Sequence, residues 1–285
     1  MKGISAVVAT YRRKDELGRL FNSIIDNNIS NIEVIVVDQN QDGLLDELIS
    51  AYSNKLDIVH LKMTEANQSK ARNYGVSKAK YPLICFPDDD CWFEPYALRQ
   101  VQDHFHRNPT TDLLVINWRQ NPVVHLNSFP LTKKEIFSFR AVGYVTYVLF
   151  FNQGVFQKLG GFVETIGIGK YIGGGEDSEL TFRAAKNNLN IYYNADIGVN
   201  HKYIPLTTRD LPVIRARSRA MGLMYASYEV PSFVVLRGFT APLVKAAFCL
   251  NRRKAKEYLN MFLGRKEGFF YGLKQKDLLE RTQAI

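Results

Sequence analysis

The chain has 285 residues, 46% hydrophobic and 23% charged, so it can bury the core of one large α/β domain or of a domain with an appendage. Its three cysteines form no C-x-x-C pair and are odd in number, which argues against a disulfide framework and fits a reducing compartment. The net charge of +9 is concentrated late: residues 201–285 hold 16 Lys/Arg against 6 Asp/Glu, which leaves 21 against 22 before them. We therefore expect the C-terminal third to form a separate basic surface.

The apolar segments are too short for a secretory signal or a membrane span. The N-terminal run is only a few residues long and is typical of a first β-strand. The nearest approach to the roughly 18 to 20 apolar residues of a membrane span is residues 232–250, which Arg237, Pro242 and Lys245 interrupt. We expect a soluble or surface-bound cytoplasmic protein.

Strand and helix signals alternate over the first 120 residues. Short apolar runs predict buried strands at residues 4–9, 33–38, 57–61, 81–86 and 112–118. Helical periodicity predicts helices between them, at residues 17–25, 44–52, 69–79 and 95–106. This order predicts a mostly parallel sheet with helices on both faces, in which ligands bind at the carboxyl ends of the strands. Asp38 and Asp88–Asp90 both fall at such ends.

The pattern changes in the second half of the chain. We expect a strand at residues 144–151, a short helix and turn at 154–162, and a glycine loop leading into a helix over 173–188. The region after about residue 205 has a helical pattern.

The acidic triplet "FPDDDCWF" is the first candidate site. Neighbouring ionised carboxylates repel and raise one another's pKa, so a cation or water must offset the repulsion. In an extended segment Asp88 and Asp90 would share a face and Asp89 would point away. Two converging carboxylates can hold Mg²⁺ or Mn²⁺; a solvated acidic turn is the alternative.

Three further candidates each have a structural alternative. Glu176 and Asp177 follow three glycines, where acids either cap a helix or act in catalysis. Arg72 can bind a phosphate or carboxylate with its planar fork, or lie on a helix surface. His201 follows a strand-like run and is either a structural histidine or a ligand.

Several motifs in one order resemble those of the family-2 glycosyltransferases, which have the GT-A (Rossmann-like) fold and use nucleotide-diphosphate sugars. The matching segments cover roughly residues 1–200: "ISAVVATYRRKDELGRLFNSI", "EVIVVDQNQDG", "NQSKARNYGVSKAKYPLICFPDDDCWFEP", "LGGFVE" and "GGGEDSEL". The resemblance implies a GT-A catalytic domain over 1–204, with a nucleotide-sugar-binding half (1–120) and an acceptor half (121–204), then a helical basic extension (205–285).

The resemblance also assigns donor-binding roles. Thr10, Tyr11 and Arg12 look like the loop that cradles the base and diphosphate. Asp38 resembles the aspartate that hydrogen-bonds uracil when the donor is a UDP-sugar, which we favour. Arg72 matches the family arginine near the donor.

The triplet resembles the D-x-D signature of the family. Asp89 is expected to contact the ribose and Asp88 the donor. Asp90 is the first choice for a Mn²⁺ or Mg²⁺ ligand, with Asp88 and His201 as further ligands.

The E-D pair resembles the catalytic acids of inverting members, with Asp177 as the general base beside Glu176. A hydroxyl of a glycan or lipid-linked acceptor would then attack the anomeric carbon, in surface polysaccharide or glycolipid synthesis.

The basic C-terminal region leaves two interpretations open. Its mixture of Lys/Arg with aromatic residues suits either an anionic membrane surface at the inner face of the cell membrane or a solvated helix packed on the catalytic domain. No nucleic acid is expected as a partner, since no recognition motif accompanies the charge. Two alternative functions remain: a nucleotidyltransferase, against which the glycine-free "ATYRRKDE" counts, and a non-catalytic basic scaffold.

Overall fold

The computed structural model describes residues 2–121, 125–139, 144–202 and 210–281 and divides into two compact units. The first unit comprises Met1–Leu131, Val142–Phe162 and Asn188–Tyr203. The second comprises Thr132–Ala141, Val163–Asn187 and Ile204–Ile285. The boundary expected between residues 204 and 205 falls outside the described residues and stays a prediction.

All the described strands belong to the first unit and form one nine-stranded sheet in the order β3-β2-β1-β4-β8-β6-β9-β5, with β7 paired to β9. Strands β1 to β4 form a parallel block, and β6 and β9 are also parallel. Strand β8 runs antiparallel between β4 and β6, and β5 and β7 run antiparallel to β9. The strands are β1 Ile4–Thr10, β2 Ile32–Asp38, β3 Asp57–Lys62, β4 Leu83–Cys85, β5 Trp92–Phe93, β6 Leu113–Trp118, β7 Phe129–Leu131, β8 Leu149–Asn152 and β9 Ile191–Asn200.

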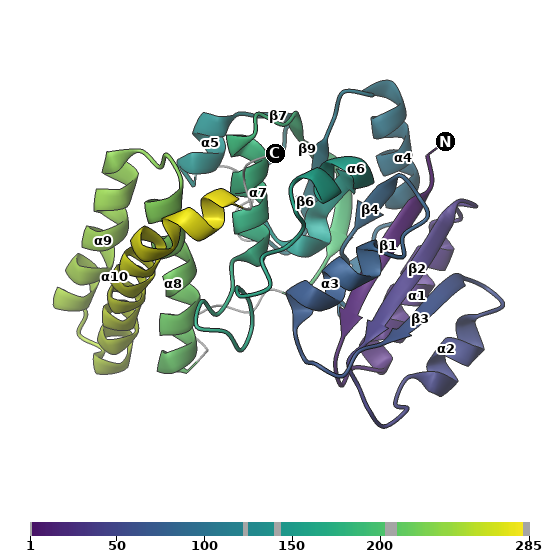
Figure 1. The fold of residues 1–285 in the computed structure, drawn as a ribbon, viewed down its shortest axis with the longest axis horizontal. Helices are drawn as coiled ribbons and strands as arrows, with labels where there is room; N and C mark the ends of the chain where they lie inside the picture. The colour runs from purple at the N-terminus through teal and green to yellow at the C-terminus, as the bar shows by residue number, and fades with distance from the viewer. Residues whose placement is uncertain (1, 122–124, 140–143, 203–209, 282–285) are drawn as a thin grey trace. The chain divides into compact units, whose positions relative to one another are not determined.

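Helices cover the sheet of this unit. Helix α3 packs against β1 and β2, in front of the sheet as Figure 1 views it. A side chain at Gly75 of α3 would overlap Val7 of β1, so glycine permits this close packing. The helices are α1 Asp15–Asp26, α2 Asp46–Tyr52, α3 Gln68–Val76, α4 Ala97–Arg107, α6 Gln153–Lys158 and the 3₁₀ helix η1 Thr146–Val148.

The expected mostly parallel α/β sheet is confirmed, with local differences. The fourth strand is shorter than residues 81–86 because Pro82 and Pro87, which lack an amide donor, flank Leu83–Cys85. The strand expected over 144–151 begins as η1, and only Leu149–Asn152 is extended. Strands β5 and β7 were not predicted, because each has only two or three residues and pairs with the distant β9.

The described part of the second unit is helical. Helix α10 lies between α8 and α9 (Figure 1). It approaches α8 closely, since a side chain at Gly264 or Gly268 would overlap a carbonyl oxygen of α8. These glycines recur every fourth residue, which places them on one helix face. The helices are α5 Lys133–Phe137, α7 Glu176–Lys186, α8 Leu211–Ser227, α9 Ser232–Ala247 and α10 Arg252–Arg281. Among the described helices, none is both long and apolar enough to cross a membrane.

Candidate active site

Parallel pairing brings three functional segments of the first unit together at the carboxyl ends of β1, β2 and β4. Thr10 at the end of β1 pairs in register with Asp38 at the end of β2, while β4 on the other side of β1 leads into the acidic triplet. The buried Thr10 hydroxyl donates to Oδ2 of Asp89 over 2.8 Å. The strand-end placement of these residues therefore follows from the fold.

Each carboxylate of the triplet has a basic partner. Asp88 Oδ1 accepts from Arg72 Nη2 at 2.7 Å, and the Arg72 guanidinium is almost wholly buried. Asp89 lies 3.2 Å from Arg13 Nη1, which also pairs with Asp90. Asp90 Oδ1 lies 3.0 Å from His201 Nε2. These three bases offset the repulsion that the sequence predicts.

The triplet forms a turn rather than a continued strand. The amide of Cys91 donates to the carbonyl oxygen of Asp88 over 3.1 Å, which closes the turn. Asp88 and Asp90 nevertheless converge while Asp89 points to Thr10, as alternation in an extended segment would also have placed them. The predicted grouping is present, but a turn produces it.

Asp88, Asp90 and His201 fit a divalent cation. One ligand atom from each lies within 4.8 Å of the other two. Two carboxylate oxygens and an imidazole nitrogen suit Mn²⁺ well and Mg²⁺ through the carboxylates. The Nδ1 atom of His201 lies 2.9 Å from the Lys202 carbonyl oxygen, which favours a proton on Nδ1. Nε2, which faces Asp90, would become the ligand atom once a cation replaces the proton between them.

Two aromatic residues orient His201. The ring of Tyr147 stacks on the imidazole, and the Trp118 ring meets it edge-on with centroids 6.1 Å apart. Trp118 Nε1 also donates to the His201 carbonyl oxygen over 2.7 Å. Neither aromatic lies in a motif, so sequence reasoning missed both.

Burial and pairing separate the pKa values of two neighbouring acids. Burial, reinforced by Asp88 and Asp90, raises the pKa of Asp89 to about 6 despite Arg13 and Thr10. Burial also acts to raise the pKa of Asp90, but the hydrogen bond and charge of His201, together with Arg13, lower it to about 2. Asp90 is therefore ionised at neutral pH and suited to bind a cation.

Asp38 is fully buried, and this chain already supplies partners to both of its oxygens. Oδ1 accepts from the backbone and side-chain nitrogens of Asn40 at 2.8 and 2.7 Å. Oδ2 lies 2.8 Å from Lys62 Nζ and 3.0 Å from His60 Nε2. Burial acts to raise the Asp38 pKa, but the Lys62, Asn40 and His60 hydrogen bonds lower it below its ordinary value. Of these partners, Lys62 is half-exposed and is therefore the most accessible one.

The loop after β1 combines one expected and one missed feature. Tyr11 and Arg12 are exposed, and Arg12 adopts a left-handed φ of 55°. The backbone amide of Arg12 donates a hydrogen bond to Asn40 Oδ1 over 2.8 Å, which supports this conformation. The missed residue is Arg13, whose guanidinium reaches the triplet. A basic pair directly after a strand that ends at the site was the available signal.

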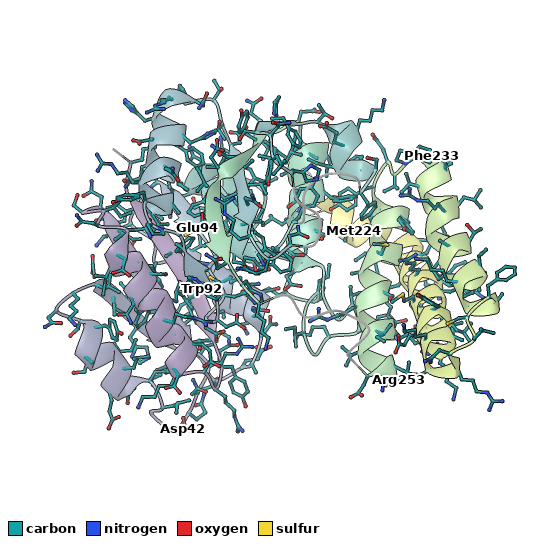
Figure 2. The ribbon with its side chains drawn as sticks, turned by 180° about the vertical axis from the view of Figure 1, so that it is seen from behind. Asp42, Trp92, Glu94, Met224, Phe233 and Arg253 are labelled. Carbon is teal, nitrogen blue, oxygen red and sulfur yellow. The ribbon has the colours of Figure 1, made fainter. Side chains whose placement is uncertain are left out.

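A second missed arginine comes from α1. Arg19 Nη2 donates to the Asp90 carbonyl oxygen over 2.7 Å. Its guanidinium stacks over the ring of Trp92, labelled in Figure 2, at 4.1 Å. Arg19 thus fixes the backbone of the triplet rather than a carboxylate.

The E-D pair belongs to the second unit. Gly175 precedes α7 with a left-handed φ of 86°, the buried Glu176 begins the helix, and Asp177 Oδ1 accepts from the amide of Ser178 over 2.6 Å. The glycines before α7 also make room for α8, because a side chain at Gly173 would approach Ala216 within 2.7 Å. Close packing is therefore one physical reason for this glycine run.

A buried ion pair lies within α7. Arg183 Nη2 and Glu179 Oε2 lie 2.6 Å apart, and both side chains are almost fully buried. The hydroxyl of Tyr228, which follows α8, donates to Glu179 Oε1 over 2.7 Å. The Tyr228 hydrogen bond thus ties α7 to the chain that follows α8.

The chain has an acidic cluster at the carboxyl ends of a largely parallel sheet. This arrangement is typical of the α/β proteins that bind ligands at this edge of the sheet. The family model "Glycosyl transferase family 2" matches residues 5–159, just over half of the chain. The chain belongs to glycosyl transferase family 2.

Individual relatives agree with this assignment. An uncharacterized glycosyltransferase of Haemophilus influenzae is 31% identical over 113 residues, which are 39% of this chain and 37% of the relative. The chain spans only about a third of the length of the first curated relatives it matches.

Solved structures match over nearly the whole chain. S. aureus TarS 1-349 in complex with UDP-GlcNAc has a TM-score of 0.63 at 16% identity, covering 99% of this chain and 87% of that one. The mannosyltransferase PcManGT from Pyrobaculum calidifontis, in complex with GDP-Man and Mn²⁺, has a TM-score of 0.62 at 14% identity, covering 99% and 86%. These likenesses confirm the expected GT-A fold.

Proposed function

We propose that the chain is a metal-dependent, inverting hexosyltransferase that transfers a sugar from a nucleoside-diphosphate sugar, with UDP favoured, to a hydroxyl group. The observation that carries this proposal is the convergence of Asp88, Asp90 and His201 at the strand ends. The complexes of TarS with UDP-GlcNAc and of PcManGT with GDP-Man and Mn²⁺ support the same ligand class.

The proposed donor site uses the residues around the triplet. Asp90, Asp88 and His201 would hold Mn²⁺ or Mg²⁺, which supplies positive charge against the departing diphosphate. Asp89 would contact the ribose. The loop Thr10–Arg12 would hold the diphosphate and base.

Asp38 and Arg72 differ in what their contacts support. Asp38 would contact the base once Lys62 moves aside. Arg72 is engaged by Asp88 and by Thr146 Oγ1 at 3.0 Å. We therefore propose that Arg72 positions Asp88 beside the donor.

Asp177, with Glu176 beside it, is the proposed catalytic base. Its carboxylate accepts the proton of the acceptor hydroxyl as that oxygen bonds to the anomeric carbon. The bond from this carbon to the diphosphate oxygen breaks, the nucleoside diphosphate leaves, and attack from the opposite face inverts the configuration. Asp177→Asn should abolish turnover while leaving donor binding intact.

The proposed acceptor is a glycan or a lipid-linked sugar in surface polysaccharide or glycolipid synthesis. A cytoplasmic enzyme held peripherally at the inner face of the cell membrane would reach a lipid-linked acceptor there. The basic charge after residue 200 supports this placement.

Calorimetric titration with UDP and then GDP, each with and without Mn²⁺, tests the donor site. We expect metal-dependent UDP binding that is lost in Asp90→Ala and kept in Asp26→Ala, which removes an exposed acid of the same unit. Binding of GDP but not of UDP would indicate that the donor is a GDP-sugar. Absence of nucleotide binding under every metal condition would contradict the proposal.

A further inference from the structure

Helix α9 is apolar on two faces. One face, with Val234, Gly238 and Pro242, is buried in the helical unit. The other carries exposed apolar side chains, and we define the α9 outer face as Leu236, Leu243, Val244, Phe248 and Leu250. Exposed apolar side chains gathered on a second face of a helix indicate a surface that contacts a partner or lipid.

The α9 outer face is a contiguous surface rather than scattered residues. Leu236, Leu243 and Val244 recur at helical spacing, so they share one side of α9. Phe248 and Leu250 extend it into the turn before α10, where they are 85% and 102% exposed. Phe233, labelled in Figure 2, is also exposed near the start of α9. Contiguous exposed apolar surface of this kind marks an interaction site.

Basic residues border the α9 outer face. Residues 232–256 contain six Lys/Arg and no Asp or Glu. The exposed bases include Arg237 on α9 and a group at the start of α10: Arg252, Arg253, labelled in Figure 2, Lys254 and Lys256. Lys245 lies on the other side of α9, seven residues after the buried Gly238, with its Nζ 5.7 Å from the Tyr258 ring. Apolar side chains with a basic border complement anionic lipid head groups above an acyl layer.

The arginines of α8 are less suited to this role. Arg215 and Arg219 both pair with Glu267 of α10, and the Arg219 guanidinium stacks over the Tyr171 ring at 4.2 Å. Internal partners therefore engage these charges. The surplus charge beside exposed apolar side chains lies instead mainly at the start of α10, with Arg237 on α9.

We propose that the α9 outer face docks on an anionic lipid surface, with α9 lying flat in the interface. The hydrophobic side chains enter the head-group boundary, and the bases at the start of α10 meet lipid phosphates. This surface gives the proposed membrane association a defined element. It involves no residue of the donor site, so the two proposals can fail separately.

Flotation of the full chain with phosphatidylcholine vesicles, with or without phosphatidylglycerol, tests the docking. We expect binding that requires phosphatidylglycerol and weakens with added salt. Combined Phe248→Ser and Leu250→Ser should lower the partition coefficient about tenfold or more. Combined Arg252→Gln and Lys254→Gln should lower it and reduce its salt dependence.

The matched control replaces two exposed apolar residues outside the α9 outer face, Leu126→Ser with Ile168→Ser, and should bind like the natural chain. Asp90→Ala should also keep vesicle binding, which separates docking from donor binding. Absence of vesicle binding at low salt, or equal loss in the control, would overturn the proposal. A second result would also overturn it: light scattering shows a dimer that the Phe248→Ser and Leu250→Ser changes dissociate, and the natural chain does not bind vesicles. A second copy of the chain would then cover the α9 outer face.

Discussion

The imidazole of His201 and the ring of Tyr147 lie nearly parallel, with centroids 4.6 Å apart and planes 5° apart. Together with the Lys202 carbonyl, this stack fixes which ring nitrogen faces Asp90. Groups that orient a metal ligand often affect affinity as much as some ligands do.

Removing the stacking ring should therefore weaken metal binding. Tyr147→Leu is expected to reduce Mn²⁺ affinity about tenfold, because the imidazole loses its fixed orientation. Tyr147→Phe keeps the ring and should stay near the natural value. Calorimetric titration with Mn²⁺ measures the metal affinity of both variants. Equal loss in the two variants would instead assign the effect to the hydroxyl.

Lys62 should compete with the nucleotide base for Asp38. Lys62→Met frees one acceptor position on Asp38 and is expected to keep or strengthen UDP binding. Asp38→Asn should weaken UDP binding about tenfold or more, since the amide presents one acceptor oxygen in place of two. Calorimetry with UDP compares the two variants. Loss of affinity in Lys62→Met would show that Lys62 itself contacts the nucleotide.

The sequence predicts the local elements and the position of the triplet, because both depend on patterns of neighbouring residues. Strand β1 and helix α1 follow from apolar runs and helical spacing. The distant partners of the triplet do not follow from such patterns. His201 was predicted only through the family resemblance, and Thr146 was not predicted. Both are far along the chain from Asp88 and Asp90, and the sheet order brings them together.

The lowered pKa of Asp38 should make the free energy of unfolding fall at acidic pH. Its pKa is below the ordinary 3.8, so its ionised form favours the folded state. This contribution is fully present above pH 3.8 and is lost as the pH falls through the lowered pKa. The difference in unfolding free energy between the natural chain and Asp38→Asn, about 1–3 kcal/mol at neutral pH, should therefore shrink in acid.

Urea unfolding at a series of pH values measures that difference. Asp26→Asn, which alters an exposed carboxyl, provides the comparison and should show little dependence. A constant difference between the natural chain and Asp38→Asn down to pH 3 would contradict the assigned role of the Asp38 charge.

Glycine at position 268 should be needed for the packing of α8 on α10. A methyl group there would overlap the Arg219 carbonyl oxygen, so Gly268→Ala should destabilise the protein by about 1–3 kcal/mol. Gly18→Ala is the control in a helix with room, where the added carbon would lie 3.6 Å from Leu48. That change should be neutral or slightly stabilising. Equal stability of the two variants in thermal unfolding would show that α8 and α10 are less closely packed.

The hydrogen bond from Tyr228 to the buried Glu179 has a consequence for exchanging the C-terminal helices of this chain. The helix that carries the proposed base owes part of its anchoring to a residue more than forty positions later in the chain. A truncated chain ending at residue 204 would leave a buried carboxylate without that donor. Replacing the C-terminal helices of this chain by those of a relative is therefore expected to preserve α7 better when the new segment supplies a tyrosine hydroxyl to Glu179.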